Sequence, residues 1–526
     1  MEIASSPPRT LTSLSPLPDG APLQASMACP TSSTATTNLS VLVPALVLVF
    51  NSAFKDTTSP CPLARLLEGV ICLFLKPRQP PQELNSYRPI TLLNCDTKLV
   101  MNIISHRLNR PLDYVIDVTQ TAFLSGRDIS DNVRYHLGLT ARLQELGLPA
   151  WLLDSDLTKA YDTVDRSWLR MVATRLGFSS VGVVRWMEIL MAGSTSIVRI
   201  NGFLSSPFKT SNGLPQGSSL SCDAWVIAFE PLLSRLNSLA LNGRLLTFPL
   251  PQPPPPPPAL LPTPRPQPYP PSPPASPAPP SSAFADDCRV LLLHPDTEGV
   301  VSVKQSFDIS AMAGLPSQSV PKTVLSLLYH PPESPLPDTL NPLLHEHHPL
   351  TGYRLSKPDD ICISLGVPYA SDPSAAVDAA FGNMAGSMTA SALRWMDLDP
   401  CLFGRVHAAN QCLASKAVYQ MSFLAPDPDR HLAPMQRAVA RLAATTRRAE
   451  EASPFPTHLF PAQHVAFLPR LAGGLGLMDL SAASLAMLAK PIWLLFSYSR
   501  HPSRPLFRHE VAASLLLTSL LAPIIG

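Results

Sequence analysis

Two adjacent carboxylates, Asp286 and Asp287, are the residues in this chain whose type and spacing most directly suggest chemistry. They lie between two short apolar runs, Ala283–Ala285 and Val290–Leu293, a pattern that predicts a strand, a tight turn and a second strand. Ionised carboxylates at a hairpin tip repel each other, and a cation between them relieves that repulsion. Because paired acids are also common in solvated loops, the pair indicates a metal site only together with further carboxylates.

Two upstream segments supply that combination. Residues 151–162 have the pattern of an apolar strand that carries Asp154 and Asp156 and leads into a helix start near Ala160. Residues 212–221 form a loop, punctuated by Gly and Pro, that opens a helix. In this order the three segments resemble the palm of a reverse transcriptase, with its strand-borne Asp, its Leu-Pro-Gln-Gly loop and its Ala-Asp-Asp hairpin. The resemblance is closest to the enzymes of non-LTR (LINE-type) retrotransposons.

The resemblance implies an α+β fold of the right-hand polymerase type, with fingers, a palm built on an antiparallel sheet, and a helical thumb. It covers roughly residues 60–247 and 283–495. The expected organisation is a loosely ordered N-terminal segment (1–59), fingers (60–150), palm (151–328), connection and thumb (329–450), and a C-terminal helical segment (451–526).

A proline tract interrupts the expected palm. From Pro249 to Pro280, 19 of 32 residues are proline, so the tract cannot form a helix or an interior strand. In polyproline II form it would extend on the order of 100 Å. We therefore predict a disordered proline-rich insertion in the palm. Two interpretations stay open: a looped-out insertion, which costs little closure entropy, or mistranslated noncoding sequence that has replaced a palm strand.

Composition sets weaker bounds. With 45% hydrophobic residues in 526, the chain is globular and long enough for one large core or two to three subdomains. A net charge of +2 neither supports nor excludes nucleic acid as a partner. Nine cysteines without a CxxC pair favour a reducing intracellular compartment, nuclear or cytoplasmic. The apolar runs 39–50 and 515–525 are shorter than the ~20 residues of a membrane span, so no membrane partner is expected.

The resemblance assigns Asp156, Asp286 and Asp287 as catalytic metal ligands, Asp287 being the weaker third. Hard carboxylate oxygens suit Mg²⁺, and the implied reaction uses two Mg²⁺ ions, with Mn²⁺ as a substitute, to activate a 3′-hydroxyl and stabilise the leaving pyrophosphate. Asp154 competes with Asp156, because residues two apart on a strand share a face. The spacing that the family keeps before its aromatic residue, here Tyr161, selects Asp156.

Several residues near these acids are candidates for contact with the substrate. Tyr161 occupies the position of the family's sugar gate, a flat ring that leaves no room for a ribose 2′-OH; the alternative is an ordinary core aromatic. Gln216 and Gly217 would lie against the template–dNTP pair, since Gly allows close backbone approach; the alternative is a plain turn. Asp162 and Asp165 fall at a helix start, where a capping role is expected.

Three basic residues are candidates for the triphosphate. Arg88 lies in a Tyr-Arg-Pro-Ile sequence that matches the family's fingers motif, and arginine forks onto phosphate oxygens. Lys76 matches less closely, and a solvated strand end is its alternative role. Lys322 would protonate pyrophosphate as a general acid. Its spacing from Gly314 is one residue longer than in the family, and Pro321 intervenes.

These expectations give an RNA-directed DNA polymerase that extends a DNA primer with a 3′-OH on an RNA template, using dNTPs, with a separate endonuclease activity as an optional partner. The alternative is a catalytically inactive retroelement relic that at most binds RNA, which the proline tract favours. The integrity of Asp156, Gln216, Asp286 and Asp287 argues against a relic. The hypotheses divide on structure, because an active enzyme needs residues 283–293 to form a hairpin against the strand that precedes Asp156.

Overall fold

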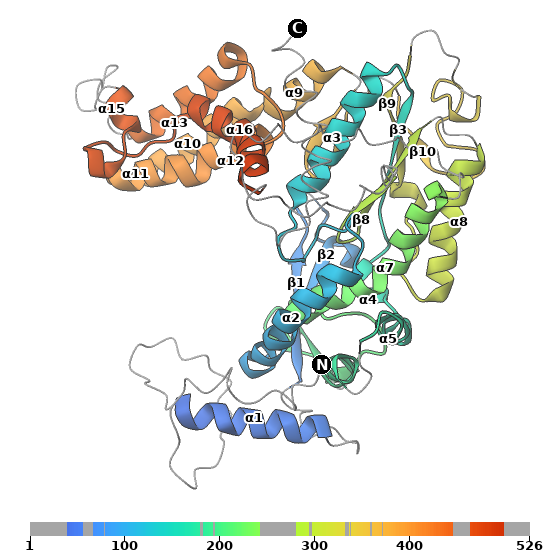
Figure 1. The fold of residues 1–526 in the computed structure, drawn as a ribbon. Coiled ribbons are helices and arrows are strands. Elements are labelled where there is room, and N and C mark those ends of the chain that lie inside the picture. The colour runs from blue at the N-terminus through green and yellow to red at the C-terminus, as the bar shows by residue number, and fades with distance from the viewer. Residues whose placement is uncertain are drawn as a thin grey trace, which may run out of the picture.

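The structure is a computed structural model of the 526-residue chain. It describes residues 39–55, 67–77, 79–178, 182–192, 195–241, 280–293, 297–331, 336, 338–357, 360–370, 372–444 and 463–498. Figure 1 shows a central sheet flanked by helices, a second sheet, and a C-terminal helical bundle. Residues 249–279 of the proline tract lie outside the described residues, so the structure does not test the predicted insertion. In the described part of the chain, no helix has the length and apolar character of a membrane span.

The central sheet has five strands in the order β10-β9-β3-β8-β7. Its middle strand β3 (Ala150–Ser155) runs antiparallel to both β8 (Asp287–Leu293) and β9 (Val324–Tyr329). On the outside, β7 (Ser281–Phe284) pairs antiparallel with β8, and β10 (Arg354–Leu355) pairs parallel with β9. The strands that the sequence predicts around the two adjacent acids are therefore present and paired.

Side chains of β3 alternate between two apolar layers. Trp151 and Leu153 pack in the largest hydrophobic core, together with side chains of the neighbouring helices. Leu152 packs on the opposite face with Leu291 and Leu328. Because successive side chains on a strand point to opposite faces, a strand covered on both sides is apolar at every position. This explains the unbroken apolar run that precedes the first acid.

Helices cover both faces of the central sheet. They are α2 (Cys95–Val115), α3 (Ile129–Glu145), α4 (Ala160–Thr163), α5 (Arg166–Arg175), α6 (Val183–Met187), α7 (Ser219–Leu241) and α8 (Thr297–Ala313). α7 contacts α2, α5, α8 and β7, and residues 224–229 within it are at most 1% exposed. A helix that is buried all round is a core element, so α7 is the support beneath the β7–β8 hairpin.

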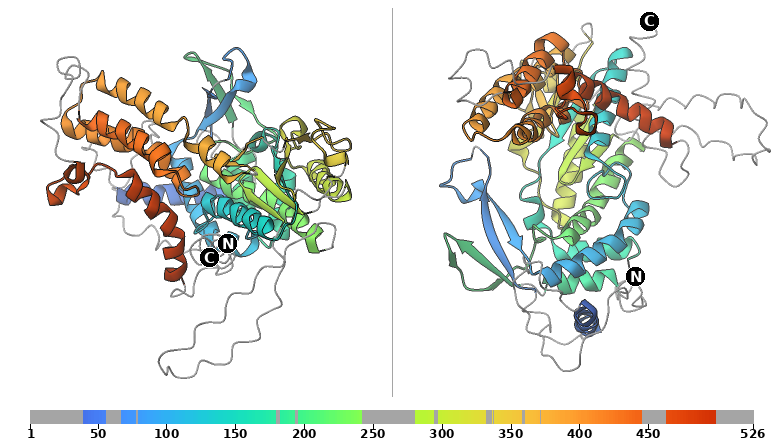
Figure 2. Two further views of the ribbon diagram at one scale, coloured as in Figure 1. Left: turned by 90° about the horizontal axis from the view of Figure 1, so that it is seen from above. Right: turned by 90° about the vertical axis from the view of Figure 1, so that its left-hand side faces the viewer.

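The second sheet projects away from these helices, as the right-hand view of Figure 2 shows. Its strands are β1 (Gly69–Leu75), β2 (Tyr87–Leu92), β4 (Thr195–Ile200), β5 (Phe203–Leu204) and β6 (Phe208–Lys209). β1 and β2 form an antiparallel hairpin, and β1 also pairs parallel with β4. Phe74 and Phe203 are 56% and 81% exposed, so much of this sheet is open to solvent.

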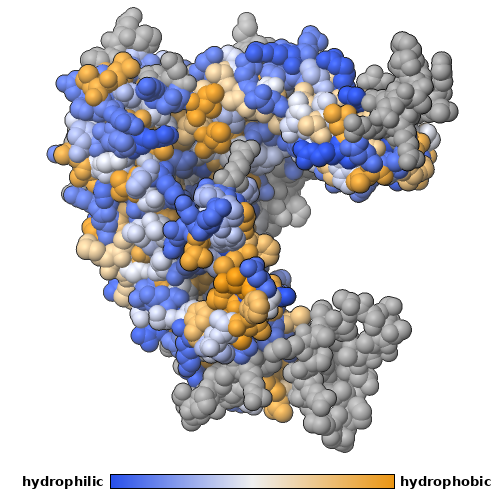
Figure 3. Space-filling model, turned by 180° about the vertical axis from the view of Figure 1, so that it is seen from behind, coloured by the Kyte–Doolittle hydropathy of each residue, from blue (hydrophilic) through white to orange (hydrophobic). Residues whose placement is uncertain are grey.

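The C-terminal part is a helical bundle with its own hydrophobic core. Its helices are α9 (Pro373–Phe381), α10 (Met384–Met396), α11 (Leu402–Ala408), α12 (Ser415–Met421), α13 (Ala433–Ala444), α15 (Gln463–Phe467) and α16 (Leu480–Tyr498). The hairpin β11 (Cys362–Ser364) and β12 (Val367–Tyr369) joins the bundle to the central sheet. Figure 3 shows the surface hollowed on one side, below this bundle.

The remaining elements are one helix near the N-terminus and several short turns. Helix α1 (Leu39–Lys55) lies at the bottom of Figure 1, where Phe54 stacks on Trp186 at 5.1 Å between ring centroids. Single turns of 3₁₀ or π helix are η2 (Leu84–Ser86), η3 (Glu188–Ala192), η4 (Val320–Lys322), η5 (Asp338–Leu340), η6 (Ala409–Ala414), η7 (Pro428–Leu432) and η8 (Arg470–Ala472). The predicted α+β class, with a largely antiparallel central sheet and a C-terminal helical bundle, is confirmed, while the right-hand arrangement and the domain boundaries stay predictions.

Candidate active site

Asp286 and Asp287 lie at the tip of the β7–β8 hairpin. Phe284 pairs with Asp287, which leaves Ala285 and Asp286 as the turn. Ala285 has a φ of 58°, a left-handed conformation that costs a residue with a Cβ about 1–2 kcal/mol. Such a conformation persists only where surrounding structure fixes it. The hairpin predicted from the sequence is confirmed, and its turn is strained.

Strand β3 brings a third acid to this hairpin. Ser155 pairs with Cys288 in the antiparallel β3–β8 register. The next residue along β3 and the preceding residue along β8 therefore lie side by side, and these are Asp156 and Asp287. The three acids that the family resemblance selects therefore lie together at one end of the strands. Asp156 directly follows β3, Asp287 begins β8, and Asp286 lies in the turn between β7 and β8.

The carboxylates repel one another in a partly buried setting. The pKa of Asp287 is raised to about 6, first by burial and then by Asp286, Asp154 and Asp156, against a lowering by Arg289. The pKa of Asp286 is also raised, by burial and by the charge of Asp156. Both shifts mean that negative charge is disfavoured at this end of the strands unless positive charge is supplied.

A hard divalent cation fits this donor set in its chemistry, because carboxylate oxygens are the ligands that Mg²⁺ prefers and because a cation would offset the burial, and then the neighbouring acids, that raise the pKa of Asp286 and Asp287. The side chains do not converge on a single point. Among the described residues, no three His, Cys, Asp or Glu side chains are close enough to hold one ion. A lysine supplies positive charge instead, since Nζ of Lys322 donates to Oδ2 of Asp156 at 3.0 Å.

The loop that carries Lys322 is bonded to the end of β3. The backbone N–H of Ser319 donates to the carbonyl of Asp156 at 2.8 Å. The side-chain amide of Gln318 donates to Oγ of Ser155 at 2.8 Å. The irregular spacing noted in the sequence therefore does not keep Lys322 from the acids, because the loop is fixed by its backbone.

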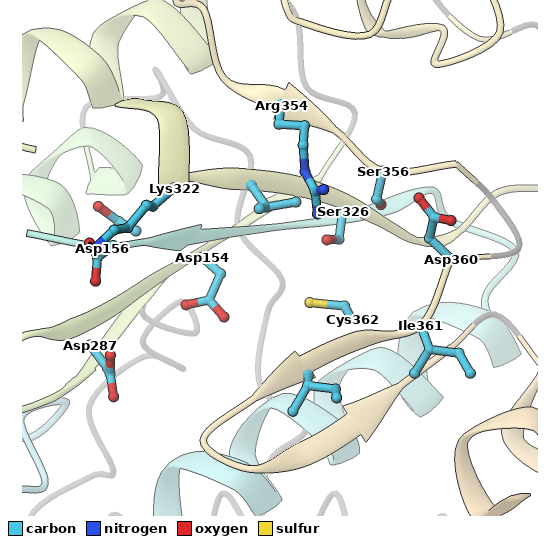
Figure 4. A pocket seen from close by; sticks show the side chains of 13 residues that line it. Asp154, Asp156, Asp287, Lys322, Ser326, Arg354, Ser356, Asp360, Ile361 and Cys362 are labelled. Carbon is cyan, nitrogen blue, oxygen red and sulfur yellow. Dashed lines mark hydrogen bonds and ion pairs between the residues drawn. The ribbon is translucent and has the colours of Figure 1, made fainter. Parts of the chain in front are cut away.

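A cavity of about 560 Å³ opens beside the acids. Asp154, Asp156, Asp287 and Lys322 lie on one side of it, and polar and apolar residues of β9 to β11, among them Arg354, line the other (Figure 4). The arrangement is a polar hollow with acidic and basic walls, open to a charged ligand.

Asp154 shares this cavity with Asp156, as the strand period predicts, but its carboxylate is engaged elsewhere. Oγ of Ser364 donates to Oδ2 of Asp154 at 2.5 Å. Arg289, whose side chain is 2% exposed, lies 3.8 Å from the other oxygen. Asp156 has only an exposed lysine as its ion-pair partner in the described structure. This difference favours Asp156 over Asp154 as the metal ligand. In the sequence, the Arg289–Asp154 pair is signalled by one feature, a single arginine at 289 that precedes the apolar run Val290–Leu293.

Tyr161 lies between the acids and the core. Its ring stacks on Trp225 with centroids 5.1 Å apart and planes inclined by 28°. Burial, then Cys222 and Asp286, raise the pKa of the Tyr161 hydroxyl, so the phenol stays neutral near neutral pH. The ring is thus both a packed aromatic and a neighbour of the acids, and the two roles weighed from the sequence are compatible.

The two acids at the following helix start behave differently. Asp165 caps α5, because its carboxylate accepts from the backbone N–H of Ser167 at 2.6 Å and of Trp168 at 3.1 Å. The capping role predicted for Asp162 is wrong. Its carboxylate instead accepts from the side-chain amide of Gln216 at 3.0 Å, which ties the 212–221 loop to the segment after β3.

Gly217 approaches the second sheet closely. The backbone N–H of Thr91 donates to the carbonyl of Gln216 at 2.7 Å. At Gly217, φ is +117° and a Cβ would lie 2.6 Å from the carbonyl oxygen of Thr91. The close approach to β2 is therefore enough to explain why residue 217 is a glycine. Contact of Gly217 with a template–dNTP pair stays a prediction.

The two basic residues predicted for the triphosphate lie on the β1–β2 hairpin. Arg88 is exposed on β2, opposite Phe74 of β1. Lys76 follows β1, and its Nζ donates to the carbonyl of Asn85 at 2.9 Å. Lys76 also lies near enough to Asp162 to oppose the burial that raises the pKa of that acid. The structure thus gathers the acids with Lys322, and leaves Arg88 and Lys76 on the neighbouring sheet.

Comparisons with known proteins bear on this site. Residues 76–248 match a family model described as reverse transcriptase (RNA-dependent DNA polymerase). Over 201 residues the chain is 32% identical to the Transposon TX1 uncharacterized 149 kDa protein of Xenopus laevis; the match covers 37% of this chain and 15% of that protein's length. Similar solved structures include telomerase from Candida albicans in complex with a TWJ fragment of telomeric RNA (11% identity, TM-score 0.40, 76% of this chain and 66% of that chain). Apo telomerase from Candida tropicalis is another (11% identity, TM-score 0.39, 87% and 71%).

Proposed function

We propose, for a chain that carries a reverse transcriptase domain of the non-LTR retrotransposon type, that it acts as an RNA-directed DNA polymerase. The family match over residues 76–248 includes two of the three motifs that indicated the resemblance, the segments 151–162 and 212–221. The substrates in this proposal are an RNA template, a DNA primer with a free 3′-OH, and dNTPs. The primer is made by a separate endonuclease activity or supplied in trans.

One observation carries the proposal. The β7–β8 hairpin forms, pairs with β3, and sets Asp287 beside Asp156 with Asp286 in the turn. The hairpin forms although a proline tract ends at its first strand, where the carbonyl of Pro280 still accepts from the N–H of Leu291 at 2.7 Å. A palm that had lost its catalytic strand would lack this pairing, so the observation favours an enzyme over a relic.

The acids define what the chain contributes to metal binding. Asp156, Asp286 and Asp287 would hold Mg²⁺, which supplies Lewis acidity toward the primer hydroxyl and neutralises charge on the phosphates. Because burial and neighbouring acids raise the pKa of Asp286 and Asp287, a bound cation would be needed to keep them ionised, and the chain's own part is to hold the carboxylates adjacent. It does so by pairing β3 with β8 and by placing the acids at one end of these strands in a rigid sheet.

Other side chains act on the nucleotide. Lys322, 3.0 Å from Asp156, is close enough to the acids to donate its proton to the departing pyrophosphate. Tyr161, held by its stacking on Trp225, limits the space at the sugar and so excludes a 2′-hydroxyl. Arg88 and Lys76 offer positive charge to the triphosphate from the neighbouring sheet.

Primer extension on an RNA template with dNTPs and Mg²⁺ tests this proposal. Four proteins are compared: the chain itself, a deletion of residues 249–279, a variant in which these residues are replaced by a Gly/Ser segment of equal length, and Asp286→Asn. The deletion keeps Pro280 because its carbonyl is bonded within the sheet. Extension by the chain that Asp286→Asn abolishes is the expected result.

The variants separate the enzyme from the relic. Extension by the chain and by both tract variants means that the tract is a tolerated insertion. Extension only after deletion or replacement means that the proline tract inhibits a competent palm. If all four proteins are folded, by circular dichroism, and none extends a primer, the proposed activity is wrong and the chain is a relic.

A further inference from the structure

The segment from Asp117 to Ala122 lies along the outer edge of β7. The N–H of Ala283 donates to the carbonyl of Thr119, and the N–H of Thr121 donates to the carbonyl of Ala283, both at 2.9 Å. These bonds add the segment to the sheet as a short parallel bridge. The edge strand of the hairpin is therefore covered rather than open, and Thr121 of the covering segment lies 162 residues before Ala283 in the sequence.

Gln120 in this segment contacts the strained turn through both ends of its side-chain amide. Its Oε1 accepts from the N–H of Ala285 at 3.1 Å, and its Nε2 donates to the carbonyl of Ala285 at 3.4 Å. Oε1 also accepts from the N–H of Ala122 at 3.1 Å. Ala285 is the residue with φ of 58°, so one buried amide satisfies both backbone groups of the residue that most needs fixing.

Gln120 is itself held in place. Only 1% of it is exposed, so it reaches no substrate. Arg127, with a side chain 2% exposed, donates to the carbonyls of Gln120 and Asp117 at 2.8 Å each, and pairs with Asp113 at 2.9 Å. This guanidinium ties the segment to the end of α2. A continuous set of bonds thus runs from Arg127 through Gln120 to the turn that carries Asp286.

We propose that Gln120 is a positioning residue, which fixes the backbone of Ala285 and thereby aims the Asp286 carboxylate for metal-dependent catalysis. The proposal rests on the polymerase function proposed above. Bidentate contact with one residue restricts two backbone dihedrals at once, because neither the N–H nor the carbonyl of Ala285 can rotate without breaking a buried bond. Loss of the amide frees the turn to relax toward an unstrained conformation, which moves the following carboxylate.

The test is Gln120→Leu, which removes both hydrogen bonds to Ala285 and the one to the N–H of Ala122, and replaces the amide with an apolar side chain of similar size. Since misplacing a catalytic group by about 1 Å can cost ~10²-fold in rate, we expect kcat for primer extension to fall roughly 10- to 100-fold. The KM for dNTP stays within about twofold, because Gln120 touches no substrate. The Mg²⁺ concentration for half-maximal activity rises several-fold.

Ala285→Gly supplies the rescue. Glycine adopts positive φ without the steric penalty of a Cβ, so the turn depends less on the clamp. We expect the double variant Gln120→Leu/Ala285→Gly to recover kcat by at least about threefold over Gln120→Leu, because glycine relieves the strain of the positive φ. A double variant no better than Gln120→Leu overturns the positioning role.

Asn132→Leu is the matched control. Nδ2 of Asn132 donates to the carbonyl of Ala283 and to Oγ1 of Thr121, both at 2.8 Å, so this variant removes buried amide bonds to the same hairpin and covering segment but none to the turn. We expect a similar fall in melting temperature for Asn132→Leu and Gln120→Leu, with kcat kept within about threefold only in Asn132→Leu. Equal losses of kcat would mean that Gln120 contributes stability alone.

Hydrogen exchange separates this inference from the proposed function. In the peptide that spans residues 281–290, Gln120→Leu should exchange one amide, that of Ala285, faster than the parent chain does. If the parent chain extends no primer, the polymerase proposal fails, and unchanged exchange in this peptide then refutes the clamp as well. Faster exchange in an inactive chain would show that the clamp exists and that the catalytic role assigned to it is wrong.

Discussion

Two antiparallel hairpins of this protein carry the groups proposed to handle a nucleotide, and they are built in opposite ways. The β7–β8 hairpin is buried on both faces and bonded at its edge to the 117–122 segment. The β1–β2 hairpin is largely exposed, with Phe74 at 56% and Leu75 at 46%. The first hairpin carries Asp286 and the second carries Arg88.

The difference follows from what each hairpin must do. Carboxylates that share a cation must keep fixed separations, and fixed separations require a packed, fully bonded backbone. A guanidinium that grips a triphosphate moves with its ligand, and an exposed strand allows that motion. Under the proposed function, the buried hairpin would set the geometry of the metal ligands, and the exposed hairpin would supply charge that adjusts to the nucleotide.

Asp286→Asn should have the largest effect on activity. It removes a carboxylate from the turn without changing the size of the side chain. The loss of primer extension should exceed the roughly 10- to 100-fold cost of losing a residue that only supports a metal ligand, and we expect activity below detection in a gel-based assay.

The same substitution should not destabilise the fold. Burial raises the pKa of Asp286, so ionisation at neutral pH is a cost in the folded state that asparagine avoids. We expect the midpoint of urea unfolding at pH 7.5, without metal, to be equal or higher in Asp286→Asn. A lower midpoint together with lost activity would point to misfolding and leave the assignment of Asp286 as a ligand without support.

Lys322→Met should come next. The Lys322–Asp156 pair is exposed, at 70% and 39% of the two side chains, and such pairs contribute about 0–1 kcal/mol to stability. Removal of a general acid typically costs 10²–10⁴-fold in rate, so we expect kcat to fall by about 10²-fold while the melting temperature changes little. Unchanged kcat would reduce Lys322 to a surface ion pair. Lys304→Met, at an i,i+4 pair on α8 in which the lysine is half-buried, is the control.

Arg88→Ala should have a smaller effect and a different signature. Loss of one charge-assisted hydrogen bond costs about 1.5–3 kcal/mol, so the KM for dNTP should rise about tenfold or more while kcat changes less. Because Arg88 is exposed, stability should stay within about 0.5 kcal/mol. Steady-state kinetics with varied dNTP measures both constants. A fall in kcat at constant KM would contradict the role of adjustable charge.

The part of this site that the sequence could predict is the part encoded locally. The apolar run before Asp156 and the runs around Asp286 have the period of strands, and their order along the chain matches a known family. The hairpin, its pairing with β3, and the cap at Asp165 follow from such local signals.

Contacts between distant segments could not be predicted in the same way. Gln120 meets Ala285 across 165 residues, and the pairing of Arg289 with Asp154 depends on the register of two strands. The prediction for Asp162 failed for the same reason, because Gln216 competes for its carboxylate from another loop. Periodicity gives the face on which a residue lies, whereas the identity of its partner depends on tertiary packing.

Gly217→Ala tests the contact between the exposed β1–β2 hairpin and the loop that precedes α7. A Cβ at this position would lie 2.6 Å from the carbonyl oxygen of Thr91 on β2, and neither backbone can give way cheaply. We expect a loss of about 1–3 kcal/mol in the free energy of unfolding. Gly202→Ala is the control, since Gly202 lies in the turn between β4 and β5 with φ of +87° and open space around it. Urea denaturation of both variants isolates the clash; equal losses would assign the effect to backbone conformation alone.

The smallest effect is a dependence of stability on pH that belongs to the buried hairpin. The pKa of Asp287 is raised to about 6 by burial and by neighbouring acids, Asp286 first among them, from about 4 in an unfolded chain. For a raised pKa, the stabilising contribution is complete below the unfolded value and is lost as pH rises through the folded value. In EDTA, the free energy of unfolding of Asp287→Asn relative to the parent chain should therefore increase between pH 4 and pH 6.5. Asp223 and Glu230, whose pKa values burial raises to about 7, titrate in both proteins and cancel in this difference.

Added Mg²⁺ should reverse the trend in the parent chain, because the ion binds the ionised carboxylate and its stabilisation grows as Asp287 loses its proton. A difference between the two proteins that does not change with pH would mean that Asp287 is not in the repulsive cluster that distinguishes this hairpin from the exposed one.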